Sequence, residues 1–241
     1  MGKEKSLFFA KLKEAGVAGN VLDAMEGVDR KKFFDPVFGD RVWSMEPLPI
    51  GLGQRSEEPI VLAKMLSLLE PTKKQRILEV GTGSGYSTAV LSRLAESVVS
   101  VDYYEFLAKT ARDRVREAGC RNARFFAGDA TDFEDDPGEF DAAVVFAGCL
   151  RTPYPILNLL KFDGILVFPM GPAHQQQIVR VINRPNAERF ADNFQFHDLC
   201  LFDSIRGKYG WMDPPPLPPD TDPIEKKPDT PSGKKDDRKE R

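Results

Sequence analysis

Three glycines at alternate positions, Gly81, Gly83 and Gly85, follow an apolar run with Glu79 near its end. Glycine allows tight turns and lets a ligand approach the backbone closely. In a dinucleotide fingerprint the third glycine comes three residues after the second, so that the pyrophosphate reaches a helix N-terminus. Here that spacing is two, and Glu79 would repel a phosphate. The motif therefore predicts a ligand that carries a ribose and an ammonium group, and a turn that binds nothing is the less favoured alternative.

Two further acids follow the next two apolar runs of the sequence. Asp102 comes about twenty residues after Gly81, where an acid binds ribose hydroxyls in this class of fold. Asp129 lies between Gly128 and Ala130. Its carboxylate is expected to bind the exocyclic amine of adenine, or else to cap the following turn. Because ligands of open α/β sheets bind at the carboxyl ends of the strands, we expect these acids and the glycine motif to lie together.

The elements that position these residues alternate regularly along the chain. Apolar runs predict strands at 75–80, 98–102, 123–127, 140–147 and 165–169. Helical periodicity predicts helices at 59–70, 86–95, 105–118 and 155–160. Further strands at 178–182 and 199–205 are expected at one edge, where antiparallel partners are common. The pattern indicates an α/β fold with a doubly wound, mostly parallel sheet.

Composition divides the chain into three segments. Residues 1–58 read as an N-terminal helical cap and a loop rich in proline and glycine, and residues 59–211 as the α/β domain. Residues 212–241 hold eight prolines among charged residues. We expect this tail to be disordered, since it has too few apolar residues to offset its ordering entropy. The alternative for its proline run is a polyproline ligand for a partner domain.

Charge and cysteine content narrow the possible partners and location. A formal net charge of -3 gives no drive toward nucleic acid, and no apolar stretch is long enough to cross a membrane. The three cysteines lack the paired spacing of a zinc site or a disulfide framework, so we expect no metal and a cytoplasmic location. Gly2 and Ser6 match the loose N-myristoylation pattern, which often arises by chance.

Several segments together resemble the protein-L-isoaspartate O-methyltransferase family. They are Pro47-Leu48-Pro49-Ile50-Gly51-Leu52-Gly53-Gln54, the glycine motif, Phe140-Asp141, and Gly164-Ile165-Leu166-Val167-Phe168-Pro169-Met170-Gly171, in the family's order and spacing. The likeness runs from the N-terminal helices to Gly210-Trp211. It implies a Rossmann-like class I methyltransferase fold with S-adenosyl-L-methionine as the methyl donor. The implied activity is methylation of isoaspartyl carboxylates in damaged proteins or peptides, which begins their repair.

The resemblance also implies a set of site residues. For the cofactor these are Glu79, Gly81, Thr82, Gly83, Gly85, Asp102, Tyr103, Gly128, Asp129, Ala130 and Gln177. For the acceptor they are Gln54, Arg55 and Glu57. Glu57 stands where the family has a serine that faces the reacting carboxylate. Two adjacent carboxylates repel unless one is protonated or a cation intervenes, and Arg55 is the expected cation.

The sequence leaves two other functions open. An anionic pocket around Glu57 would suit a cationic or amine acceptor, and the chain would then be a methyltransferase with another substrate. The other alternative is a catalytically silent S-adenosylmethionine-binding adaptor that recruits partners through its tail. Two departures from the family's pattern, Phe146 and Cys149, lie at or just after the end of the fourth predicted strand, and Cys149 is expected to be a buried packing residue. His174 is expected to be an exposed turn residue.

Overall fold

The computed structural model describes residues 2–132, 138–185, 190–208 and 210. The chain divides into a unit of residues 1–211 and a second of residues 212–241. The predictions for the proline-rich tail, and for Trp211 at its boundary, lie outside the described residues. No helix in the described ranges is both long and apolar enough to cross a membrane.

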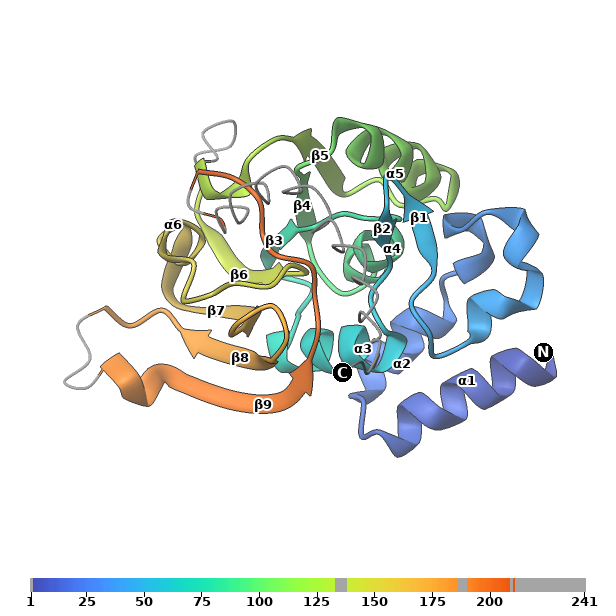
Figure 1. The fold of residues 1–241 in the computed structure, drawn as a ribbon, viewed down its shortest axis with the longest axis horizontal. Coiled ribbons are helices and arrows are strands. Elements are labelled where there is room, and N and C mark those ends of the chain that lie inside the picture. The colour runs from blue at the N-terminus through green and yellow to red at the C-terminus, as the bar shows by residue number, and fades with distance from the viewer. Residues whose placement is uncertain (1, 133–137, 186–189, 209, 211–241) are drawn as a thin grey trace, which may run out of the picture. The chain divides into compact units, whose positions relative to one another are not determined.

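A seven-stranded sheet forms the centre of the first unit (Figure 1). Its strands lie in the order β5-β4-β3-β6-β7-β8-β9. They are β3 (Arg76–Val80), β4 (Ser97–Asp102), β5 (Ala123–Ala127), β6 (Phe140–Val145), β7 (Leu160–Met170), β8 (Gln176–Ile182) and β9 (Phe194–Cys200). The five strands β3 to β7 are parallel, and β8 and β9 are antiparallel to their neighbours. The predicted doubly wound, mostly parallel sheet is confirmed.

Both faces of the sheet are covered. Successive side chains of a strand point to opposite faces, so a single strand contributes to two buried cores. Ile77 of β3 belongs to one buried core, while Leu78 and Val80 belong to the other. The helices that cover the sheet are α3 (Pro59–Leu69), α4 (Tyr86–Ser92), α5 (Glu105–Glu117) and α6 (Tyr154–Leu157). Each lies within or next to a predicted helix.

The N-terminal segment is helical, as predicted, and shares a core with the sheet. It contains α1 (Lys3–Glu14), α2 (Gly19–Glu26) and two 3₁₀ turns, η1 (Arg30–Phe33) and η2 (Pro36–Trp43). Side chains from α1 and α2 pack with those of α3 and α4 in one apolar cluster. Figure 1 shows α1 and α2 in blue beside α3. A short hairpin, β1 (Pro49–Gly51) and β2 (Gln54–Arg55), then leads from this cap to α3.

The strand predicted at 199–205 is wrong in its bounds. β9 runs from Phe194 to Cys200, and the chain then leaves the sheet. The buried Gln176 side chain causes this departure, because it donates to the Phe202 carbonyl (3.0 Å) and accepts from the Phe202 amide (2.8 Å). Residues 201–208, which we call the strap, continue past the end of β6. There Gly148 donates to the Asp203 carbonyl (2.8 Å) and accepts from Ile205 (2.9 Å).

Candidate functional site

The glycine loop between β3 and α4 has a conformation and a packing that only glycine suits. The φ angles of Gly81, Gly83 and Gly85 are 91°, 53° and 87°. A Cβ on Gly85 would lie 2.9 Å from the Cβ of Ala111, and one on Gly81 would lie 3.1 Å from the Phe146 carbonyl oxygen. The loop is therefore held against both neighbouring elements, with its backbone open to a ligand on the remaining side.

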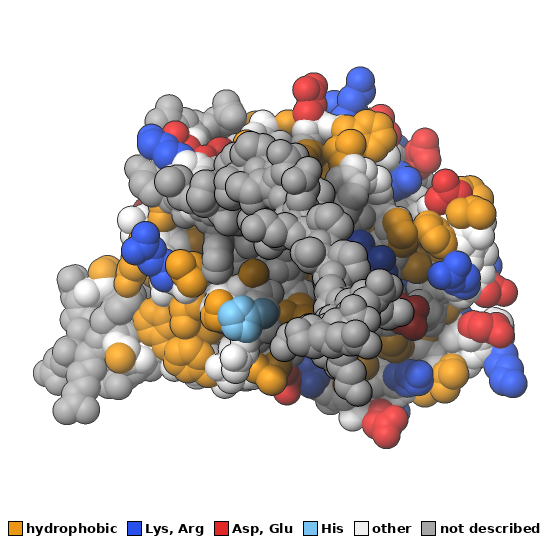
Figure 2. Space-filling view, viewed as in Figure 1, with side chains coloured by type: hydrophobic (Ala, Val, Ile, Leu, Met, Phe, Trp, Pro, Cys, Tyr) orange, Lys and Arg blue, Asp and Glu red, His pale blue; other side chains and the backbone are white. Residues whose placement is uncertain are grey.

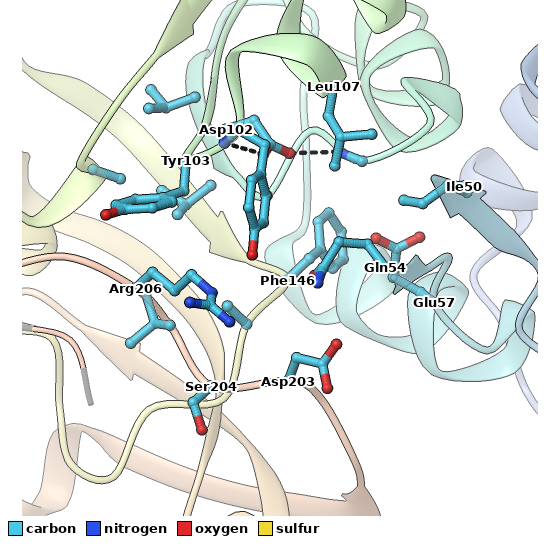
Figure 3. A pocket seen from close by; sticks show the side chains of 18 of the residues that line it. Ile50, Gln54, Glu57, Asp102, Tyr103, Leu107, Phe146, Asp203, Ser204 and Arg206 are labelled. Atoms are coloured by element: carbon cyan, nitrogen blue, oxygen red, sulfur yellow. Dashed lines mark hydrogen bonds between the residues drawn. The ribbon is translucent and has the colours of Figure 1, made fainter. Parts of the chain in front are cut away.

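Asp102 connects this loop to the end of β4. One carboxylate oxygen accepts from the backbone N–H of Gly83 and the other from that of Tyr104, both at 2.9 Å (Figure 3). The side chain is nearly buried, and burial raises the pKa of its carboxyl group. Asp102 thus lies beside the glycine motif.

A cavity opens at this edge of the sheet, and we call it the cofactor cavity. Nine predicted site residues line it: Gln54, Arg55, Glu57, Gly81, Gly83, Asp102, Tyr103, Gly128 and Ala130. Four strap residues that the sequence did not indicate complete the wall, namely Asp203, Ser204, Ile205 and Arg206. In Figure 3, Asp102 and Tyr103 lie on one side of the cavity and Gln54, Glu57 and Asp203 gather on another.

Glu79 does not border this cavity and lies behind the glycine loop. It is fully buried, and one of its oxygens accepts from Ser100 Oγ (2.6 Å) and from the Thr88 hydroxyl. Its other oxygen has no hydrogen-bond partner among the described residues. Burial raises the pKa of Glu79 to about 7, more than these hydroxyl donors lower it.

Three other predicted cofactor residues also lie away from the cavity wall. Thr82 is buried and hydrogen bonded to Ser100 (2.6 Å), and Gly85 packs against Ala111. Gln177, on β8, donates to the carbonyl of His197 (3.0 Å). Each of them makes structural contacts next to the cavity without lining its wall.

Asp129 anchors the strap instead of facing the cavity. One carboxylate oxygen accepts from the N–H (2.7 Å) and hydroxyl (2.6 Å) of Thr131, and the other accepts from the Lys208 amide (2.6 Å). Gly207 approaches so closely that a Cβ there would lie 2.0 Å from the Asp129 carboxylate. The turn cap, one of the two roles expected from the sequence, is therefore the one observed.

We predict that loosening this anchor frees the strap. Gly207→Ala should destabilise the protein, because its Cβ would displace the Asp129 carboxylate, and Asp129→Ala should act similarly. Loss of such a charged hydrogen bond costs about 1.5 to 3 kcal/mol. Hydrogen exchange of the Ile205 and Lys208 amides, measured together with the free energy of unfolding, checks this.

Gly119→Ala is the matched control for that experiment. Gly119 also has a positive φ (87°), but a Cβ there would meet nothing within 4 Å. It therefore measures the cost of backbone strain alone. Equal effects of Gly207→Ala and Gly119→Ala would contradict the anchoring role of Asp129.

A second cavity adjoins the first, and we call it the acceptor cavity. Five residues line both: Gln54, Arg55, Glu57, Phe146 and Asp203. Its other walls come from the segment before α3, the turn before β8, and residues 199–202. Leu199 and Leu201 are 67% and 70% exposed on this wall, and apolar side chains gather on the same face of the molecule (Figure 2). The two cavities thus meet at a junction lined by an aromatic ring, an amide, two acids and one arginine.

Glu57 is half-buried at this junction, and the cation that acts on it is not the expected one. Burial raises the pKa of Glu57 to about 7; the charge of Arg30 opposes this rise and the charge of Asp102 adds to it. Arg55 is exposed, and its guanidinium donates to the carbonyl of Pro47. The expectation that Arg55 neutralises Glu57 is therefore replaced by a through-space interaction with Arg30.

Arg30 is a buried cation near the site whose effect on Glu57 sequence reasoning missed. It is 1% exposed, its Nε donates to the Val42 carbonyl (2.7 Å), and its guanidinium lies 4.6 Å from the ring centre of Tyr86. Charge alone does not distinguish it from its exposed neighbours Lys31 and Lys32. Only the packing of the N-terminal cap against α4 brings this cation near the site.

The remaining candidates have structural roles. Cys149 is buried, and burial raises the pKa of its thiol to about 12, as expected for a packing residue. His174 is exposed on the rim of the acceptor cavity. Among the residues that the structure describes, no group of three or more His, Cys, Asp or Glu could hold a metal ion.

Comparisons with known proteins point to one family. The family model described as protein-L-isoaspartate(D-aspartate) O-methyltransferase matches residues 3–197. The chain is 42% identical over 180 residues to protein-L-isoaspartate O-methyltransferase 2 of Rhodopseudomonas palustris strain HaA2, covering 74% of this chain and 83% of the relative. It is 41% identical over 193 residues to the enzyme of strain BisB5, covering 79% and 86%. The chain also superposes on a Plasmodium falciparum structure with a TM-score of 0.69 at 18% identity, covering 86% of this chain and 99% of that one. That structure is described as a putative protein-L-isoaspartate O-methyltransferase in complex with S-adenosyl-L-homocysteine.

Proposed function

The chain belongs to the protein-L-isoaspartate(D-aspartate) O-methyltransferase family, and on this premise we propose that it transfers the methyl group of S-adenosyl-L-methionine to isoaspartyl carboxylates in damaged proteins and peptides. One observation supports this most strongly. Two cavities at the carboxyl edge of the sheet meet at a junction lined by Gln54, Glu57 and Phe146. A methyl donor in one cavity and a peptide in the other would place their reacting groups at that junction.

The residues of the cofactor cavity fit S-adenosylmethionine. Gly81 and Gly83 offer an open backbone, and Asp102 offers a carboxylate for the ribose hydroxyls. Tyr103, Gly128 and Ala130 line the part of the cavity in which we place the adenine. The Glu79 oxygen without a partner also suits a ligand that carries an ammonium and a sulfonium, because nearby positive charge favours the ionised form of this acid.

Positioning provides most of the rate enhancement in this proposal. When bound, S-adenosylmethionine supplies an electrophilic methyl group on its sulfonium. The acceptor carboxylate is already ionised, so no general base is needed, and the protein's task is to align the acceptor oxygen with that methyl group. We assign Gln54, Arg55 and Glu57 to this alignment, because they lie where the two cavities join.

A methyl-transfer assay on three matched peptides tests the function. The peptides share one sequence and carry isoaspartate, aspartate or an amine-bearing residue at one position. Formation of S-adenosylhomocysteine should be seen with the isoaspartyl peptide alone. The acids Glu57 and Asp203 at the junction favour the second candidate, an amine acceptor, and turnover of the amine peptide alone would establish it. Cofactor binding without turnover on any peptide would indicate the silent adaptor.

We also propose that the enzyme acts in the cytoplasm on protein substrates. Cys120, Cys149 and Cys200 are free thiols, which persist in a reducing compartment. Damaged proteins of that compartment are then its substrates.

A further inference from the structure

The proposed reaction brings an anionic acceptor to an acidic junction. Glu57 and Asp203 line both cavities, so an acceptor carboxylate that reaches the cofactor comes close to these acids. Two carboxylates about 4 Å apart repel by about 4 kcal/mol at an effective dielectric constant of about 20. The junction therefore needs a positive charge or a proton.

The nearby cations are each engaged by other groups. Arg30 is 1% exposed beneath Tyr86 and Phe34 and does not line the acceptor cavity. Arg55 lines both cavities, but its guanidinium donates to the Pro47 carbonyl. Arg206 lines the cofactor cavity, where its guanidinium lies 5.7 Å from the ring centre of Tyr104. A proton on one of the two junction acids is therefore the more direct way to seat a carboxylate there.

Glu57 is the acid whose surroundings favour a proton. It is half-buried, whereas Asp203 is exposed. In the described part of the chain, no hydrogen bond or ion pair joins its carboxyl group to another side chain. The charged groups that face it are Arg30 from η1, Asp102 at the end of β4, and Glu79 of β3. Asp203 and Arg55 line both cavities with it, Glu58 and His174 line the acceptor cavity, and Arg206 lines the cofactor cavity. The charge of Asp102 and the desolvated position of Glu57 thus oppose one buried cation, Arg30.

We propose that Glu57 binds the acceptor as a neutral carboxylic acid, donating its O–H to one oxygen of the acceptor carboxylate and leaving the other oxygen to face the methyl group. This inference rests on the proposed function. The proton stays on Glu57 throughout. The acceptor oxygen would form the new O–CH₃ bond with its own electron pair while the S–CH₃ bond of the donor breaks, and the electrons of that bond would stay on sulfur, so charge and protons balance without a base. Glu57 therefore orients the acceptor by a charge-assisted hydrogen bond, which is among the stronger hydrogen bonds in proteins.

The direction of the pH dependence follows from this arrangement. The pKa of Glu57 is about 7 in the free protein, so the donor form dominates below that pH and is lost above it. An acceptor carboxylate beside it raises the pKa further, because like charges disfavour ionisation. The decline in kcat/KM, which reports the free enzyme, should thus occur near pH 7, and the decline in kcat at a higher pH.

The test is the pH profile of wild type and Glu57→Gln between pH 6 and 8.5 with the isoaspartyl peptide. S-adenosylhomocysteine formation is the readout, because it is unaffected by hydrolysis of the methyl ester product. Wild-type kcat/KM should fall roughly tenfold between pH 6 and pH 8 as the donor form is lost. Glu57→Gln keeps a donor that does not titrate, so its profile should be nearly flat. Glu96→Gln alters an exposed acid that lines neither cavity and should keep the wild-type pH dependence.

Peptide affinity measured in the presence of S-adenosylhomocysteine provides a second readout on wild type alone. It should weaken over the same pH range, independently of how well any variant folds. Robust turnover with a flat wild-type profile, or parallel profiles for wild type and Glu57→Gln, would overturn the inference and leave the proposed function standing. No turnover of the isoaspartyl peptide at any pH, with cofactor binding intact, would overturn both.

Discussion

Asp102→Ala should lower the affinity for S-adenosylmethionine roughly ten- to a hundredfold. The Asp102 carboxylate lines the cofactor cavity and accepts hydrogen bonds from the backbone of Gly83 and Tyr104. Its removal takes away the proposed ribose acceptor and also releases the glycine loop from β4. Charge-assisted hydrogen bonds of this kind contribute about 1.5 to 3 kcal/mol. Titration calorimetry with S-adenosylmethionine or S-adenosylhomocysteine measures the change.

Asp141→Ala is the matched control. Asp141 also accepts from a backbone N–H, that of Arg76 (2.7 Å), and pairs with Lys161 (2.7 Å). It lies near the start of β6, at the opposite edge of the sheet from the cavity. Its replacement should reduce stability and leave cofactor affinity unchanged. If Asp102→Ala binds the cofactor as tightly as wild type does, the ribose site lies elsewhere.

Glu79→Gln should stabilise the cofactor-free protein at alkaline pH. The folded-state pKa of Glu79 is about 7, against a reference value of 4.5, so folding favours the protonated acid. Its stabilising contribution is full below the reference value and is lost as the pH rises through 7. Glutamine keeps an acceptor for Ser100 and Thr88 but does not ionise. The gain in unfolding free energy should therefore be about 2 to 3 kcal/mol larger at pH 8 than at pH 5.

Urea denaturation of wild type and Glu79→Gln at both pH values checks this prediction. Glu96→Gln, which changes an exposed acid, should give equal differences at the two pH values. A Glu79→Gln gain that is the same at pH 5 and pH 8 would show that Glu79 does not ionise in this range. The comparison between variants cancels the titration of all other groups.

Local patterns sufficed to predict the parts of the site that depend on one strand and its following turn. The glycine loop and Asp102 were placed correctly, because both directly follow buried strands whose carboxyl ends meet at one edge of the sheet. Glu79 was assigned to the same edge for the same reason. Its side chain points instead toward Ser100 and Thr88, because successive residues of a strand face opposite sides.

Contacts between distant segments could not be predicted in this way. The hydrogen bond from Lys208 to Asp129 and the effect of Arg30 on Glu57 leave no trace in hydrophobic periodicity. Both ends of β9 were misplaced, since the strand begins at Phe194 and not at residue 199. The predicted strand ran too far because the apolar run continues through Leu201 and Phe202, whereas the polar side chain of Gln176 decides where pairing stops.

The strap has a consequence for how the enzyme is made. Lys208 closes onto Asp129 across 79 positions of sequence, and strap residues 203–206 form one wall of the cofactor cavity. A nascent chain on the ribosome can fold its glycine loop and first strands long before this wall has been synthesised. Closing so distant a contact is also slow, since it orders a long stretch of chain at once. We therefore expect ligand binding to be the last property that a newly made molecule acquires, and a fragment released before the strap to be folded in part but unable to hold the cofactor.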